Sequence, residues 1–213
     1  LRNMSQAGVD ENLIRKALLT GAEKSKALPF RFVAARNAAP RFEPVLDEAM
    51  KIAVKTMAPL KGRTYVLIDV SGPMTGRLSG KSDLNRIDAA AALGVLICCL
   101  SESARVFTFS NWVKEVPPRS SLSLIEAVKR SQPNGGTELG KAVAELNRLG
   151  AYDRLIVVTD EQSHDRVPSP TGRGYLINVA TCKNGVGYGN WVHIDGFSES
   201  VVNFIQAYEQ EER

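Results

Sequence analysis

The chain has 213 residues, of which 44% are hydrophobic and 23% charged, which is typical of one globular domain with or without an attached segment. It contains no apolar run of the roughly 18 residues that a transmembrane helix needs, so we expect no membrane association. The net charge of +4 is uneven, with 12 Lys or Arg against 6 Asp or Glu in residues 1–63 and 15 against 17 in residues 64–213. A polyanionic partner would therefore contact the amino-terminal segment.

The chain begins with Leu1, and residues 1–20 are polar and amphipathic, unlike a secretory signal. We therefore expect it to be a piece of a longer protein. Its three cysteines, Cys98, Cys99 and Cys182, show neither metal-ligand spacing nor a disulfide framework. This pattern indicates a reducing compartment, and we expect a cytoplasmic protein.

The first 60 residues are predicted to form three helices separated by prolines, at 9–26, 30–39 and 43–57. The apolar stripe expected on the first helix consists of Leu13, Ala17, Leu18 and Ala22. Such a pattern is typical of the end of a helical-repeat region. Because each helix has an apolar face, we expect the three to pack on the following domain or on another partner. Residues 58–63 are expected to be a linker.

From residue 64 onward, apolar runs rich in β-formers alternate with helical patterns. The expected strands are 64–71, 104–110, 112–116, 153–160, 175–180 and 191–195. The expected helices are a long apolar one that Asp83 or Asn85 caps and that runs to Leu100, two at 121–130 and 138–149, and a last one that Ser198 caps. This alternation predicts an α/β fold with a doubly wound, mostly parallel six-stranded sheet and a short amino-terminal helical segment. We expect two domains, at 1–60 and 64–213.

Oxygen-bearing side chains stand at three connections of this predicted sheet. Asp69 and Ser71 end the first strand, Thr137 follows two glycines, and Asp160 ends the fourth strand. The carboxyl ends of parallel strands share one edge of a sheet, and Mg²⁺ prefers oxygen ligands. These four residues therefore predict a divalent-cation site. Each stretch taken alone is more typical of a turn or a helix cap, so the prediction depends on the combination.

Residues 64–213 resemble a von Willebrand factor A domain, a Rossmann-like fold. The resemblance rests on Asp69-Val70-Ser71, on Thr137 and on Asp160. It implies a metal-ion-dependent adhesion site in which bound Mg²⁺, or another divalent cation, accepts an acidic oxygen from a protein partner. Pro73 stands where the motif of that family has its second Ser, so a water or Thr75 must replace that ligand.

Two further stretches resemble Ro autoantigen (TROVE-module) proteins, in which helical repeats lead into an A domain. They are Leu28-Pro29-Phe30-Arg31-Phe32 and Asp195-Gly196-Phe197. This resemblance implies a ribonucleoprotein that binds small non-coding RNA, acts in RNA quality control and, in bacteria, works with an exoribonuclease. The side chains expected to contact RNA are Arg31, Arg36, Arg41, Lys51 and Lys55. A solvated helix face explains the same basic residues equally well.

An enzyme using the same oxygens, either a metal-assisted hydrolase or a phosphotransferase, is the alternative. A serine nucleophile needs a base within hydrogen-bond reach, and neither His164 nor His193 is obviously placed for this role. His164 follows the stretch after Asp160, so it is a candidate for supporting the site from outside. We therefore expect a non-enzymatic binding module.

Overall fold

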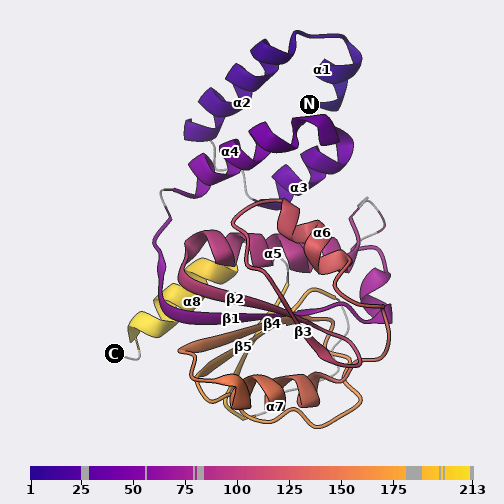
Figure 1. Cartoon of the computed structure of the whole chain (residues 1–213). Coiled ribbons are helices and arrows are strands. Elements are labelled where there is room, and N and C mark those ends of the chain that lie inside the picture. The colour runs from indigo at the N-terminus through magenta and orange to yellow at the C-terminus, as the bar shows by residue number, and fades with distance from the viewer. Residues whose placement is uncertain are drawn as a thin grey trace.

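The computed structural model describes residues 1–24, 29–55, 57–78, 80, 84–180, 189–196, 198 and 200–211. Four residues named above, Leu28, Asp83, Cys182 and Phe197, lie outside these ranges. In the part described, a sheet lies between two helical layers, and a further set of amino-terminal helices lies on one of them (Figure 1). The helices in these ranges are too short or too polar to cross a membrane.

The described sheet has six strands in the order β3-β2-β1-β4-β5-β6. They are β1 (Leu60–Asp69), β2 (Ser101–Phe109), β3 (Val113–Val116), β4 (Arg154–Thr159), β5 (Arg173–Asn178) and β6 (Trp191–Asp195). All neighbours are parallel except β2 and β3, which form an antiparallel hairpin. The predicted doubly wound, mostly parallel fold is confirmed. Its strand order reverses between β1 and β4, which is where open α/β sheets bind ligands.

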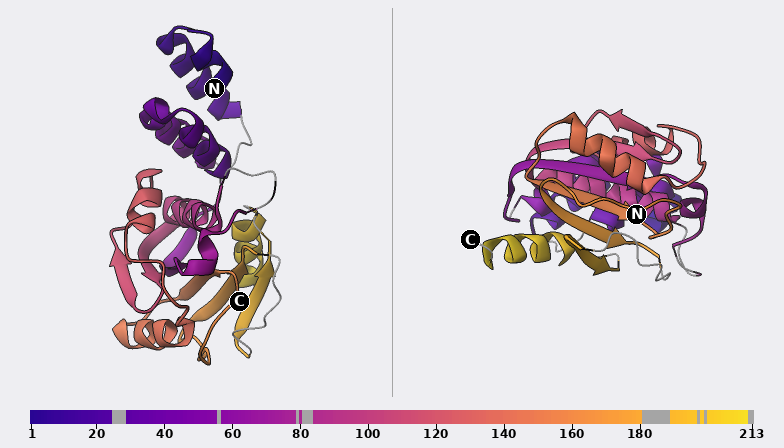
Figure 2. Two further views of the ribbon diagram at one scale, coloured as in Figure 1. Left: turned by 90° about the vertical axis from the view of Figure 1, so that its right-hand side faces the viewer. Right: turned by 90° about the horizontal axis from the view of Figure 1, so that it is seen from below.

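Alternating side chains of the buried strands supply one core on each face of the sheet. On one face, residues such as Val66 and Ile68 pack with α5 (Arg86–Leu100), α6 (Ser123–Lys129) and α8 (Ser200–Glu211). On the other face, Tyr65 and Leu67 pack with α7 (Leu139–Leu149). The left view of Figure 2 shows the helices that cover the two faces of the sheet. This period of two is what a strand buried on both faces requires.

The buried helix α5 begins with a reciprocal cap. The side chain of Asn85 accepts a bond from the backbone N–H of Asp88 at 2.7 Å, and the Asp88 carboxylate accepts one from the Asn85 N–H at 3.2 Å. The cap fixes where the helix starts. As its apolar sequence predicts, α5 is buried on nearly all sides.

The amino-terminal helices are α1 (Arg2–Gln6), α2 (Glu11–Lys24), α3 (Pro29–Ala38) and α4 (Glu43–Val54), with a 3₁₀ turn, η1, at Pro40–Phe42. Helices α3 and α4 contact α5, and α2 packs on α4, so the segment packs on the α/β part as expected. The predicted stripe on α2 was wrong in part. Leu13 is 58% exposed, whereas its neighbour Ile14 is buried. Ala17 is also exposed, whereas Leu18 is half-buried and Ala22 buried as predicted, so the apolar face runs through Ile14 in place of Leu13.

Two other expectations were wrong around β1. Residues 58–63 are not a linker, because the strand begins at Leu60, which pairs with Ser101. Gly62 has a positive φ of 79° at an irregularity in this pairing, so the glycine marks a bulge in the strand. The small, polar segment 72–82 was expected to be a surface loop, but it begins with a 3₁₀ turn, η2 (Gly72–Thr75), whose Met74 side chain is buried.

Helix α8 is attached to the sheet by a buried ion pair. Two nitrogens of Arg154 on β4 donate to the Glu209 carboxylate at 2.7 and 2.6 Å. Tyr175 on β5 also donates to Glu209, at 3.1 Å. Burial opposes ionisation of Glu209, but the bonds from Arg154 outweigh it and hold its pKa below the usual range. Removing one partner leaves the other charge buried without compensation.

We therefore expect Glu209→Gln to lower the free energy of unfolding by about 3–5 kcal/mol, measured by urea denaturation at pH 7. Because the folded-state pKa is depressed, this stabilisation is present above the unfolded-state pKa and is lost as the pH falls through the folded one. The matched control is Glu48→Gln, which removes an ion pair with Arg15 whose two side chains are half exposed. Equal effects of the two substitutions would show that the buried pair stabilises the fold no more than the exposed one.

Candidate functional site

Asp69, the last residue of β1, is a fully buried acid of the predicted site. Its Oδ1 accepts a bond from the Ser71 N–H at 2.8 Å, and its Oδ2 accepts one from the Thr159 hydroxyl at 2.7 Å. Thr159 is close because β1 and β4 are paired up to Ile68 and Val158. Burial raises the pKa of Asp69 to about 6, and the negative charge of Asp160 adds to this shift while the two hydrogen bonds oppose it.

The loop that carries Thr137 is hydrogen-bonded to the end of β1. The Gly72 N–H donates to the Gly135 carbonyl at 3.0 Å, and the Asn134 side chain donates to the Val70 carbonyl at 2.6 Å. A Cβ at Gly136 would lie 2.8 Å from Asn111 Oδ1, so this close approach requires glycine. Thr137 itself is buried. Gly136 therefore lets the loop pack closely against Asn111 in the turn between β2 and β3.

Asp160 follows β4 and is also buried. Its Oδ2 lies 3.2 Å from Arg86 Nη1, and its Oδ1 accepts a bond from the Gln162 N–H at 3.3 Å. Burial raises the pKa of Asp160, whereas the Gln162 bond and the Arg86 charge oppose the shift. The loop beyond it returns to Thr137, whose carbonyl accepts a bond from the His164 N–H at 3.1 Å. The three predicted stretches thus form one connected cluster at the switch point.

The chemistry of this cluster fits a divalent cation. It contains two buried carboxylates, Asp69 and Asp160, and the Ser71 hydroxyl oxygen is buried without a hydrogen-bond partner in the described structure. A buried oxygen without a partner costs about 1–3 kcal/mol, which a cation ligated there would offset. Thr75, considered as a substitute ligand, donates its hydroxyl to the Gly72 carbonyl at 2.7 Å and stabilises the turn.

Sequence reasoning missed two residues that contact the site acids, Thr159 and Arg86. Thr159 lay inside an apolar strand and gave no signal. Arg86 did give one, because it is the first residue of a helix that is otherwise almost wholly apolar. A positive charge is unfavourable at a helix N-terminus, so an arginine there indicates a nearby anion.

The five basic residues predicted to contact RNA differ in their surroundings. Arg31, Lys51 and Lys55 are exposed. Lys51 and Lys55 line a hollow of about 290 Å³, together with Met57, Cys99 and Ser120. Arg36 is mostly buried and pairs with Glu43 at 2.8 Å and Glu126 at 3.0 Å, which links α3 to α4 and α6. Arg41 lies 3.4 Å from Glu11 and packs over the Phe42 ring.

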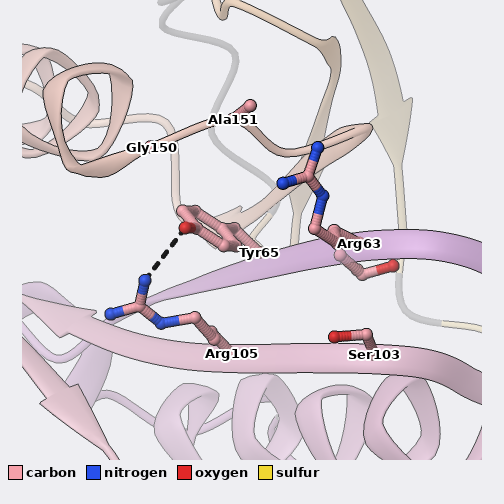
Figure 3. Close-up of a pocket in the computed structure, with 7 residues that line it drawn as sticks. Arg63, Tyr65, Ser103, Arg105, Gly150 and Ala151 are labelled. Carbon is pink, nitrogen blue, oxygen red and sulfur yellow. Dashed lines mark hydrogen bonds between the residues drawn. The ribbon is translucent and has the colours of Figure 1, made fainter.

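A second hollow, of about 260 Å³, lies at the amino ends of β1 and β2, opposite the edge that carries Asp69 (Figure 3). Its two arginines have acidic neighbours. Arg105 donates to both oxygens of Glu115 at 2.8 Å and to the Tyr65 hydroxyl at 2.9 Å. Arg63 lies 3.8 Å from Asp153. Because both charges are compensated, this hollow has no strong attraction for an anion.

Comparison with known proteins gives two informative matches, although no family model matches the chain. The RNA-binding protein RO60 of Deinococcus radiodurans is 28% identical over 137 residues, which cover 62% of this chain and 26% of that protein. The crystal structure of the Ro protein (RSR) of Deinococcus radiodurans matches all of this chain with a TM-score of 0.72 and 20% identity.

The chain resembles a Ro protein. The predicted resemblance is thereby confirmed, in sequence over the region matched and in fold over the whole chain. The present chain covers 52% of the solved Ro chain, about half of its length. Neither match assigns the cation ligands or the RNA-contacting side chains, so both sets of residues stay predictions.

The effect of the buried Asp69 charge on the stability of the fold can be tested in the absence of metal. Its folded-state pKa of about 6 lies above the ordinary value, so ionisation of Asp69 destabilises the fold as the pH rises from about 4 to about 6. Asp69→Asn removes this charge. We expect the variant to be more stable than the wild type at pH 7, by up to about 3 kcal/mol, in urea denaturation with a chelator present.

The advantage of Asp69→Asn should disappear near pH 4, where the wild-type carboxyl is protonated. Glu145→Gln, which neutralises an exposed acid on α7, is the control and should have little effect at either pH. A variant that is less stable than the wild type at pH 7 would show that the ionised carboxylate stabilises the fold.

Proposed function

We propose that this chain is a non-enzymatic binding module of a Ro-like RNA-binding protein, with a divalent-cation site at the end of β1. The observation that carries the cation site is the clustering of two buried carboxylates at the switch point of the sheet with Ser71, whose buried hydroxyl makes no hydrogen bond within the described structure. Asp69, Ser71, Thr137 and Asp160 would hold Mg²⁺ or another divalent cation. When bound, such a cation supplies an open coordination position for an acidic oxygen of a protein partner.

RNA binding is proposed for the helical segment, because the relative that the chain matches in sequence is an RNA-binding protein. Exposed Arg31, Lys51 and Lys55 are the side chains best placed to meet phosphates. The ligand would be a small structured non-coding RNA, and the full-length protein would act in cytoplasmic RNA quality control with an exoribonuclease partner. This chain alone would provide only part of the RNA surface.

A non-enzymatic role is favoured over hydrolysis or phosphotransfer. A serine nucleophile requires a base within hydrogen-bond reach. The acid beside the Ser71 side chain is Asp69, whose two oxygens already accept bonds from the Ser71 N–H and the Thr159 hydroxyl. His164 donates its backbone N–H to the Thr137 carbonyl, and its ring lies beside Gly136. Turnover of RNA or phosphoesters that disappears in Asp69→Ala would favour the enzyme instead.

Titration calorimetry with Mg²⁺ and Mn²⁺ tests the cation site. We expect saturable heats for the wild type and their loss in Asp160→Ala and Ser71→Ala, because each variant removes one ligand oxygen. Asp195→Asn is the control, since it neutralises an exposed acid at the end of β6 outside the proposed ligand set. Equal heats in the wild type and Asp160→Ala would refute the site.

Gel-shift titration with a small structured RNA tests the helical surface. We expect weak, strongly salt-dependent binding, with a dissociation constant around micromolar or higher. The double variant Lys51→Ala/Lys55→Ala should weaken binding and reduce the slope of log K against log salt by about 1–2, since up to two phosphate contacts are lost.

The matched control for RNA binding is Lys141→Ala/Arg148→Ala, which removes the same charge from α7 on the opposite face of the sheet. This variant should bind like the wild type. Tight binding that is insensitive to salt, or equal losses in the two double variants, would contradict the placement of the RNA surface.

A further inference from the structure

One of the two site acids, Asp160, is already in contact with a positively charged side chain, that of Arg86. The guanidinium of Arg86 lies with Nη1 at 3.2 Å from Asp160 Oδ2. The Asp160 side chain is fully buried and that of Arg86 is 21% exposed. Salt and water screen the attraction within a mostly buried pair much less than within a pair on the surface.

The same guanidinium nitrogen donates to the Pro73 carbonyl at 3.3 Å. Pro73 is the residue that replaces a hydroxyl ligand of the expected adhesion motif, and proline offers only its carbonyl oxygen to a hydrogen-bond donor. The backbone of Arg86 is also fixed in this loop, since its N–H donates to the Gly76 carbonyl at 3.0 Å. The loop that lacks one cation ligand therefore binds an arginine instead.

Arg86 stands at a position of its helix that is unfavourable for a positive charge. It is the first residue of α5, where the unpaired N–H groups of the helix disfavour a positive charge. An arginine at this position needs a compensating anion, and Asp160 provides it. The guanidinium is also partly accessible to solvent, so it can leave the carboxylate by rotation of its own side chain without unfolding α5.

We propose that Arg86 is an intramolecular counter-ion of Asp160, and that Arg86 and a divalent cation exclude each other at this carboxylate. The proposal rests on the cation site of the proposed function. A guanidinium on Asp160 occupies an oxygen that a metal would need and adds repulsion between positive charges. Cation binding therefore requires Arg86 to move away, and the affinity of the site is set by this competition.

Titration of Mn²⁺ into the wild type and Arg86→Gln tests the competition, with heats measured by calorimetry and the free ion by electron paramagnetic resonance. We expect Arg86→Gln to bind Mn²⁺ at least about tenfold more tightly, because the competing charge is gone. Arg86→Met is measured alongside, so that misfolding of one neutral variant, seen by circular dichroism, does not decide the result. Arg86→Lys keeps the charge and should retain an affinity near that of the wild type.

Arg77→Gln is the matched control, because it removes the same charge from an exposed arginine of the same connection. It should leave Mn²⁺ affinity unchanged. An equal gain in Arg77→Gln and Arg86→Gln would overturn the proposal, since the effect would then be one of net charge alone.

Two further outcomes separate failure of the competition from failure of the cation site. If the wild type and both neutral Arg86 variants bind Mn²⁺ equally, the competition is wrong while the cation site stands. If none of them binds Mn²⁺ at millimolar concentration, the cation site is wrong and the competition fails with it. If Arg86→Gln binds Mn²⁺ more tightly and Arg86→Gln/Asp160→Ala does not bind it, both the competition and the cation site are supported.

Discussion

Asp69 and Asp160 lie buried near one another where β1 and β4 end, and burial of two acids is unfavourable unless their charges are compensated. The surroundings of the two residues follow from this constraint. The Ser71 N–H and the Thr159 hydroxyl bind Asp69, and Arg86 binds Asp160. The pKa of both carboxyls is nevertheless raised, so the compensation is incomplete. Carboxyl groups with raised pKa values are common at functional sites, where a ligand supplies the compensating charge that the protein lacks.

The fold could be predicted from the sequence where one signal dominated. Continuous apolar runs gave β4 and β5, and an apolar stretch beginning at an Asn cap gave α5, because burial on both sides leaves few other ways to satisfy such segments. Prediction failed where two signals competed. Pro59 and Gly62 indicated a linker, but pairing with β2 extends β1 back to Leu60. On α2, Leu13 and Ile14 are equally apolar, and only contact with α4 decides which of them is buried.

The candidate site, like the fold, could be predicted from the sequence only in part. Asp69, Ser71, Thr137 and Asp160 were predicted to meet because topology alone brings strand ends to one edge of a parallel sheet. The sequence did not show which side chains contact these acids, although an arginine at the start of an apolar helix indicated a nearby anion. Thr159 depends on the register between β1 and β4, and Arg86 depends on how the turn at Pro73 presents its carbonyl. Pairing register and loop geometry are properties of the packed chain, and no local pattern of residues specifies them.

Helix α5 connects the two surfaces for which functions are proposed. Its first residue, Arg86, contacts the site acid Asp160, and Cys99 near its other end lines the hollow beside Lys51 and Lys55. Its 15 residues span about 22 Å and are buried on nearly all sides, so the helix is a rigid spacer. An RNA on the amino-terminal helices and an acidic group at the sheet edge would therefore share no contact residue. On the proposed functions, this fixed spacing would allow both ligands to be bound at once, and Arg86 would act only on the acidic one.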